Sequence, residues 1–82
     1  MAVETSEYLG AARRFIRAAG RRVAAADEVE LGELIGLHEV LDEAISTAVA
    51  GMRDRGMSWA YIAGATGTSR QAAFQRWGKR VE

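Results

Sequence analysis

The sequence predicts an all-α protein, and three observations carry this prediction. The 82 residues contain sixteen alanines and no proline, so helical propensity is interrupted at few points. Apolar residues recur at intervals of three and four, which is the helical period. No segment shows the sustained period-two alternation of a strand. We therefore expect four helices in a single domain over residues 1–82: a hairpin of two long helices, then two shorter ones.

The first helix is expected over residues 6–25. Its apolar residues follow one another at intervals of three and four, which places them in one stripe on the helix surface. The arginines of this segment lie mostly off the stripe. The stripe consists of Tyr8, Ala12, Phe15, Ile16, Ala19 and Val23.

A second helix is expected from about 29 to 55 and carries the best apolar periodicity in the chain. Asp27 and Glu30 have the spacing of a capping box, in which each side chain satisfies an unpaired backbone N–H at a helix start. Gly56 is placed to end the helix in the left-handed conformation. His38 lies on the stripe without a companion ligand, so we interpret it as a packed or interface histidine. The stripe consists of Leu31, Leu34, Ile35, His38, Leu41, Ile45, Ala48, Val49 and Met52.

Two shorter helices follow. Ser58 is a natural N-cap for the third helix, and Gly67 is suited to end it. Ser69 then caps the fourth helix, which runs toward the C-terminus. Two helices joined by three or four residues that include glycine are typical of a helix-turn-helix. The sequence therefore predicts a helix-turn-helix over 56–82, behind the two long helices of 5–55.

Packing explains the spacing within this segment. Ala63 is expected where the third helix crosses the fourth, because only a small side chain permits that approach. Ile62, Ala73 and Trp77 are expected to point into the core. Trp59 and Trp77 are interpreted as core residues rather than as platforms on which bases stack.

The formal net charge of zero is a cancellation of blocks. Seven acids and no lysine or arginine lie between 27 and 43, whereas 53–80 holds six basic residues and the single acid Asp54, a net of +5. A basic C-terminal segment is suited to phosphates. The arginine cluster of residues 13–22 is interpreted as a solvated face or as an intersubunit partner for the acidic block.

The outward face of the fourth helix is the candidate DNA-binding surface. Arginine donates two hydrogen bonds to guanine, and glutamine pairs in the same way with adenine. The Ser69 hydroxyl and the N–H groups of the helix start suit a phosphate. Three alternatives remain open. Gln71 and Gln75 could be solvated polar residues without a binding role, and Phe74 could lie at the edge of the buried arc instead of contacting a thymine methyl. Arg76 could form an ion pair with an acid of the second helix. The candidate residues are Ser69, Arg70, Gln71, Phe74, Gln75, Arg76, Lys79 and Arg80, with Arg53 and Arg55 as further phosphate contacts.

The stretch 56–78 resembles the C-terminal signature of small helix-turn-helix proteins from GC-rich bacteria, G-x-S-W-x-x-I-x-x-x-x-G-x-[ST]-R-Q-A-A-x-Q-R-[WF]-G. It is also similar to the helix-turn-helix of sigma-factor region 4 and of serine-recombinase tails. The resemblance covers the last quarter to third of the chain and implies a DNA-binding module with the Ser-Arg-Gln end of the fourth helix in the groove. Thr66 and Thr68 stand where that family usually has an aliphatic residue, which predicts a less well packed turn.

The leading hypothesis is a sequence-specific DNA-binding protein, a transcriptional regulator located in the cytoplasm at the nucleoid. One short helix reads only a few base pairs, so we expect a homodimer, formed through the first two helices, on two half-sites of double-stranded DNA. The alternative is a protein–protein interaction adaptor, polymerase-associated or antitoxin-like, that uses the same fold without reading bases. Its acidic second helix would then dock a basic partner.

The composition argues against catalysis and against metal binding. The chain has no cysteine and one histidine, which leaves too few ligands for a zinc or iron site and no positioned base for a catalytic triad. No G-K-[ST] follows a glycine-rich loop. No apolar run approaches the ~18 residues of a membrane span, and the N-terminus is not signal-like. We expect no catalytic residue, no cofactor, no small-molecule ligand and no membrane association.

Overall fold

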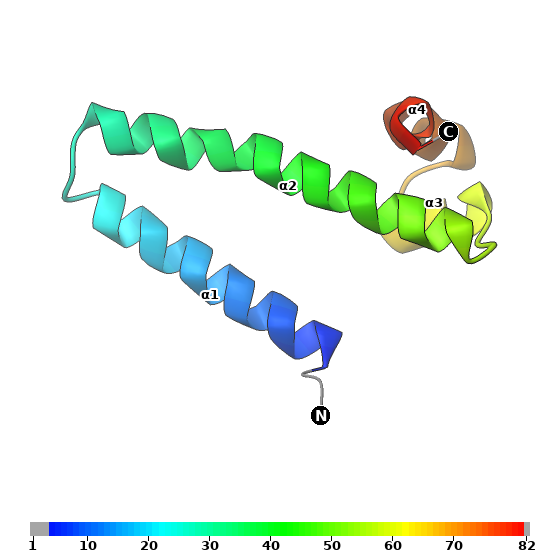
Figure 1. The fold of residues 1–82 in the computed structure, drawn as a ribbon, viewed down its shortest axis with the longest axis horizontal. Helices are drawn as coiled ribbons and strands as arrows, with labels where there is room; N and C mark the ends of the chain where they lie inside the picture. The colour runs from blue at the N-terminus through cyan, green and yellow to red at the C-terminus, as the bar shows by residue number, and fades with distance from the viewer. Residues whose placement is uncertain (1–3, 82) are drawn as a thin grey trace. The chain divides into compact units, whose positions relative to one another are not determined.

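The computed structural model describes residues 4–81, with side chains as far as Lys79 (Figure 1). The described chain contains four helices and no strand, so the predicted all-α class is confirmed. Predicted and observed bounds agree within two residues. None of the described helices is long and apolar enough to cross a lipid bilayer. The helices are α1 (Thr5–Val23), α2 (Glu28–Asp54), α3 (Trp59–Thr66) and α4 (Arg70–Val81).

The chain consists of two compact units, and the division between them falls inside α2, after His38. The N-terminal unit holds α1 and the first part of α2. The C-terminal unit holds the remainder of α2 together with α3 and α4. The last turns of the long helix thus belong with the two short helices, because they supply one side of the only core among the described residues.

The N-terminal unit is a helical hairpin that turns at residues 24–27 (Figure 1). Asp27 caps α2 as predicted: its Oδ1 accepts a hydrogen bond from the Val29 N–H at 3.1 Å. The Glu30 side chain and this N–H hold the pKa of the Asp27 carboxyl below its ordinary value. No described residue of this unit is buried. The predicted apolar stripe of α1 therefore has no core of its own to fill.

The end of α2 is closed by a left-handed glycine, as predicted. Gly56 has φ +89°, and the N–H of the following Met57 donates to the Met52 carbonyl at 3.1 Å. Arg53 completes this end: its Nη1 donates to the Met57 carbonyl at 3.0 Å. Its guanidinium also lies 5.1 Å from the centre of the Trp59 ring. Arg53 thereby ties the end of α2 to the start of α3.

The core of the C-terminal unit lies among α2, α3 and α4. Ile62 is the most deeply buried large side chain, at 2% exposure, and Ala73 is fully buried. Ile45 and Met52 pack against the core from α2. The small side chains at the α3–α4 contact allow the two backbones to approach, as the sequence predicts. The buried hydrophobic residues are Val49, Trp59, Ile62, Ala63, Ala73 and Trp77.

The turn between α3 and α4 spans residues 67–69. Ser58 caps the start of α3 by accepting the Tyr61 N–H at 3.0 Å. Gly67 ends α3 at φ +72°, ψ +21°, and its N–H donates to the Ala63 carbonyl. The Thr68 N–H donates to the same carbonyl at 3.1 Å. The predicted cap Ser58 and the predicted terminator Gly67 are therefore confirmed.

Thr66 and Thr68 close this turn with hydroxyl groups instead of aliphatic packing. The Thr66 hydroxyl donates to the Ala63 carbonyl at 3.1 Å, and the two threonine hydroxyls lie 3.0 Å apart. Both residues are exposed, so aliphatic side chains here would gain little from burial. Hydrogen bonds thus close a turn in which neither threonine is buried.

Two glycines three residues apart should respond to alanine with opposite signs. Gly67→Ala places a Cβ in the left-handed region and should lower the free energy of unfolding by about 1–2 kcal/mol. Gly64→Ala adds a methyl group in open space within α3 and should raise it by about 1 kcal/mol. Urea unfolding followed by tryptophan fluorescence measures both. If both substitutions change the free energy of unfolding by the same amount, the left-handed conformation of Gly67 contributes nothing to stability.

Candidate nucleic-acid interface

The site begins at the N-terminus of α4, where Ser69 is the cap. Its Oγ accepts the Ala72 N–H at 3.1 Å, and its carbonyl accepts the Ala73 N–H at 3.0 Å. The hydroxyl hydrogen stays available to a second group. The N–H groups of Arg70 and Gln71 bond no other described residue. Three donors at the positive end of a helix dipole therefore face outward, which suits an anionic oxygen.

The outward side of α4 is set by its buried side. Ala73 and Trp77, one turn apart, are both in the core. Helical geometry then places Gln71, Gln75 and Lys79 in a single row on the other side, each four residues from the next. All three are exposed. We call these three residues the outer row.

Arginines flank the outer row on both sides. Arg70 is exposed at the start of the helix. Arg76 is also exposed, and its guanidinium lies 5.4 Å from the centre of the Trp77 ring. Arg76 makes no ion pair with an acid of α2 among the described residues, so the bracing alternative is not observed. The contact fixes its charge next to the Trp77 ring.

Phe74 lies at the edge of the buried arc, which is one of the two interpretations that the sequence left open. Its ring stands edge-on to Trp59, with centroids 5.5 Å apart and an angle of 88° between planes. The side chain is nevertheless 47% exposed. It also covers Gly78, where a Cβ would lie 2.8 Å from Phe74 Cδ2. One side of the ring is thus fixed by packing, and the remainder is presented next to Arg70.

The contact between Phe74 and Gly78 gives a prediction. Alanine normally favours a helix interior over glycine by about 1 kcal/mol. Gly78→Ala should fail to stabilise the protein, because the new methyl group displaces the Phe74 ring from Trp59. In a Phe74→Ala background, Gly78→Ala should again stabilise the helix, because no ring occupies the position of the new methyl group. Thermal unfolding of the four proteins in this double-mutant cycle measures the coupling. Additive effects would mean that Phe74 does not rest on Gly78.

Three of the predicted phosphate contacts, Arg53, Arg55 and Arg80, differ in their surroundings. Arg53 is half-buried and bound to Met57 and Trp59, which gives it a structural role, and its contact with a phosphate stays a prediction. Arg55 is exposed beyond the end of α2. The backbone of Arg80 lies in α4, but its side chain falls outside the described residues.

Sequence reasoning overlooked two residues of this surface. Ala72 is exposed between Gln71 and Ala73, and its small side chain lets another molecule approach the backbone of α4 closely. Tyr61 is exposed on α3, with its phenol available as a hydrogen-bond donor. The signal for Tyr61 was its position three residues after the Ser58 cap, off the face that carries Ile62 and Ala63.

The electrostatics of this surface are of one sign. From residue 55 to 81 the chain has five basic residues and no acid. Within the described residues, no cluster of three histidine or carboxylate side chains is arranged to hold a metal ion. Comparisons with protein-family models, curated proteins and solved structures find no match for this chain. The described surface is a row of amide and ammonium groups flanked by guanidinium groups, which is chemistry for binding an anionic polymer.

Proposed function

We propose that this protein binds double-stranded DNA in a sequence-specific manner, with α4 as a recognition helix in the major groove, and acts as a transcriptional regulator. The observation that carries the proposal is the outer row of Gln71, Gln75 and Lys79 on a helix whose other side is locked into a core. A rigid helix with exposed amides is suited to the donor and acceptor pattern of base edges. α3 and the turn at 67–69 complete a helix-turn-helix.

Each part of the surface has a distinct role in this proposal. Gln71 and Gln75 read bases, and Arg70 either reads guanine or contacts a phosphate at the edge of the groove. Phe74 contacts a thymine methyl with the exposed part of its ring. The Ser69 hydroxyl and the neighbouring N–H groups bind a backbone phosphate, while Lys79 and the other basic residues, Arg76 and Arg80, supply phosphate contacts that salt screens.

Selection of bound sequences from a random duplex pool tests the proposal. The expected result is an enriched consensus of a few base pairs per recognition helix. Binding to that consensus should weaken steeply with rising salt, because phosphate contacts release counterions. If no consensus emerges and the bound pool stays random, sequence-specific recognition is excluded.

An adaptor that contacts a protein through the same helices is the competing function, and the same experiment separates the two. An adaptor would show weak binding to every duplex with no preferred sequence. Substitution of Gln71 or Gln75 by alanine would leave the binding of an adaptor to its protein partner unchanged, but it would weaken base-specific binding to DNA. The absence of acids between residues 55 and 81 favours DNA over a protein surface of mixed charge.

A further inference from the structure

The hairpin of α1 and the first part of α2 exposes large apolar side chains on both helices. Phe15 is 79% exposed and Tyr8 69%. In the N-terminal unit these side chains enclose no core, since none of its described residues is buried. A solvent-facing helix rarely carries such a set, because each exposed side chain forgoes its transfer free energy. The exposed set is Tyr8, Leu9, Phe15, Ile16, Val29, Leu31, Ile35 and Leu37.

The amount of exposed apolar surface matches a protein interface. On α2, Leu31 and Ile35 share one face, whereas Val29 and Leu37 lie on other sides of the helix. Aromatic residues of this kind offer about 150–250 Å² and aliphatic side chains about 60–120 Å², so the exposed fractions of the α1 residues together with Leu31 and Ile35 sum to on the order of 500 Å². A standard interface buries about 800 Å² per partner, of which somewhat over half is apolar. The hairpin therefore presents the apolar surface of one side of a standard-size interface.

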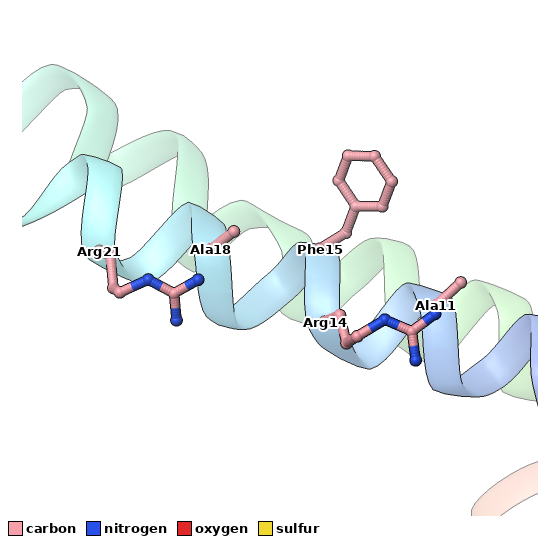
Figure 2. Close-up of a pocket in the computed structure, with 5 residues that line it drawn as sticks. All are labelled: Ala11, Arg14, Phe15, Ala18 and Arg21. Atoms are coloured by element: carbon pink, nitrogen blue, oxygen red, sulfur yellow. The ribbon is translucent and has the colours of Figure 1, made fainter.

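The faces of α1 are sharply divided. Phe15 points from one side of the helix, and Arg14 and Arg21 extend from the other (Figure 2). Hollows lie on either side of the Phe15 ring: one is lined by Ala11, Arg14, Phe15, Ala18 and Arg21, the other by Tyr8, Ala11, Ala12 and Phe15. The alanines around a protruding ring form holes of the kind that receive side chains of a partner helix.

The two helices of the hairpin carry opposite charge. α1 has five arginines and one acid, whereas residues 27–38 have four acids and no lysine or arginine. None of the α1 arginines makes an ion pair with a described residue of its own chain. A second copy related by a two-fold axis brings a basic α1 against an acidic α2 twice, once on each side of the axis. An unrelated partner would have to match both signs independently.

We infer that the apolar faces of α1 and of the first part of α2 are covered by a second copy of this chain. The occupant is the same hairpin, so that four helices enclose the exposed apolar side chains. Each α1 lies beside the partner's α2, with arginines and carboxylates along the borders of the apolar contact. This inference stands independently of DNA binding, although it would place two α4 helices in one particle.

Light scattering on the full chain tests the inference directly. The expected particle mass is twice the chain mass of 8.9 kDa, at concentrations from low micromolar to several hundred micromolar. The melting temperature should rise with concentration, because dissociation and unfolding are linked. A folded monomer throughout this range would overturn the inference, since it would require the chain to cover its own apolar faces. A larger assembly would also overturn it.

Phe15→Glu is the sharpest single change. In an isolated chain this side chain is exposed and the substitution should be tolerated. In the dimer it places a carboxylate in the apolar contact and should raise the dissociation constant at least about tenfold. Ala60→Glu, at an exposed position on α3 outside the hairpin, is the matched control and should leave the mass unchanged. An unchanged mass for Phe15→Glu would contradict the assignment.

A charge exchange tests the choice of a second copy. Arg13 lies one turn from Leu9 and Ile16, and Arg22 two turns from Phe15, so both border the apolar face of α1. Glu28 and Glu39 lie in the same way beside Leu31 and Ile35 on α2. Two double variants, Arg13→Glu with Arg22→Glu and Glu28→Lys with Glu39→Lys, exchange these charges.

Each double variant alone places like charges against each other and should be largely monomeric. The equimolar mixture restores opposite charges at both contacts and should form a heterodimer that salt weakens. Failure of the mixture to associate would exclude pairing between chains. Circular dichroism reports helix content, and the concentration dependence of the wild-type melting temperature decides the outcome if a variant unfolds. DNA binding is measured on the same variants. A variant that no longer dimerises but still binds one half-site in a salt-dependent manner would show that dimerisation and DNA binding fail independently.

Discussion

Gln71→Ala is expected to lower the affinity for the selected duplex about 5- to 150-fold, the equivalent of about 1–3 kcal/mol for one paired amide–base contact. Gln71 is exposed at the outward side of α4 and contributes nothing to the core. The melting temperature of the free protein should therefore stay unchanged. Affinity for an unrelated duplex should also stay unchanged, because that binding depends on phosphate contacts.

Lys79→Ala is the matched control, since Lys79 belongs to the same row. Its loss should weaken binding to selected and unrelated duplexes by similar factors and reduce the slope of log affinity against log salt by about one. Titrations of both duplexes at several salt concentrations measure the two variants side by side. If Gln71→Ala and Lys79→Ala behave alike, the assignment of base readout to Gln71 is wrong.

Ile62→Ala is expected to have the largest effect on stability. Ile62 is 2% exposed at the centre of the only described core, and truncation leaves a cavity that costs about 2–5 kcal/mol. A chain of this length has a total stability of about 4–12 kcal/mol, so the change removes a large fraction of it. The neighbouring Tyr61 is exposed on the same helix, and Tyr61→Ala should change stability by no more than about 0.5 kcal/mol. Urea unfolding measures both, and similar losses would contradict the described core.

Local signals predicted the helix bounds because each bound depends on only a few adjacent residues. Asp27, Ser58 and Ser69 cap helices as their side-chain chemistry requires. Gly56 and Gly67 adopt the left-handed conformation that ends a helix. These interactions span two to five residues of chain, so no tertiary information is needed to find them.

Periodicity predicted which α2 residues share a face but not what covers that face. Ile45, Val49 and Met52 pack against α3 and α4, whereas Leu31 and Ile35 of the same stripe are exposed. The pattern of the sequence is continuous across this boundary. Burial depends on a neighbour, and for the first half of the stripe the described chain supplies none.

The sequence predicts which side of α4 is exposed, but it does not predict the contacts that Arg53 makes. The exposed row on α4 follows from the spacing of Ala73 and Trp77, which the sequence already assigned to the core. Arg53 was interpreted as a further phosphate contact because it belongs to the basic C-terminal segment. Its bond to the Met57 carbonyl and its place over Trp59 require the chain reversal at Gly56. Such a contact is visible only in three dimensions.

The central claim is that the two glutamines of the outer row, Gln71 and Gln75, read base pairs. The most direct measurement is the affinity of wild type and of Gln71→Ala for the selected site and for each of its single-base-pair variants. For wild type, each base-pair substitution at a contacted position should weaken binding by about 1–3 kcal/mol. For Gln71→Ala, substitution at one of these positions should leave the affinity unchanged, while substitutions at the other positions should still weaken binding. Parallel profiles for the two proteins, displaced by a constant factor, would show that Gln71 reads no base and would contradict the claim.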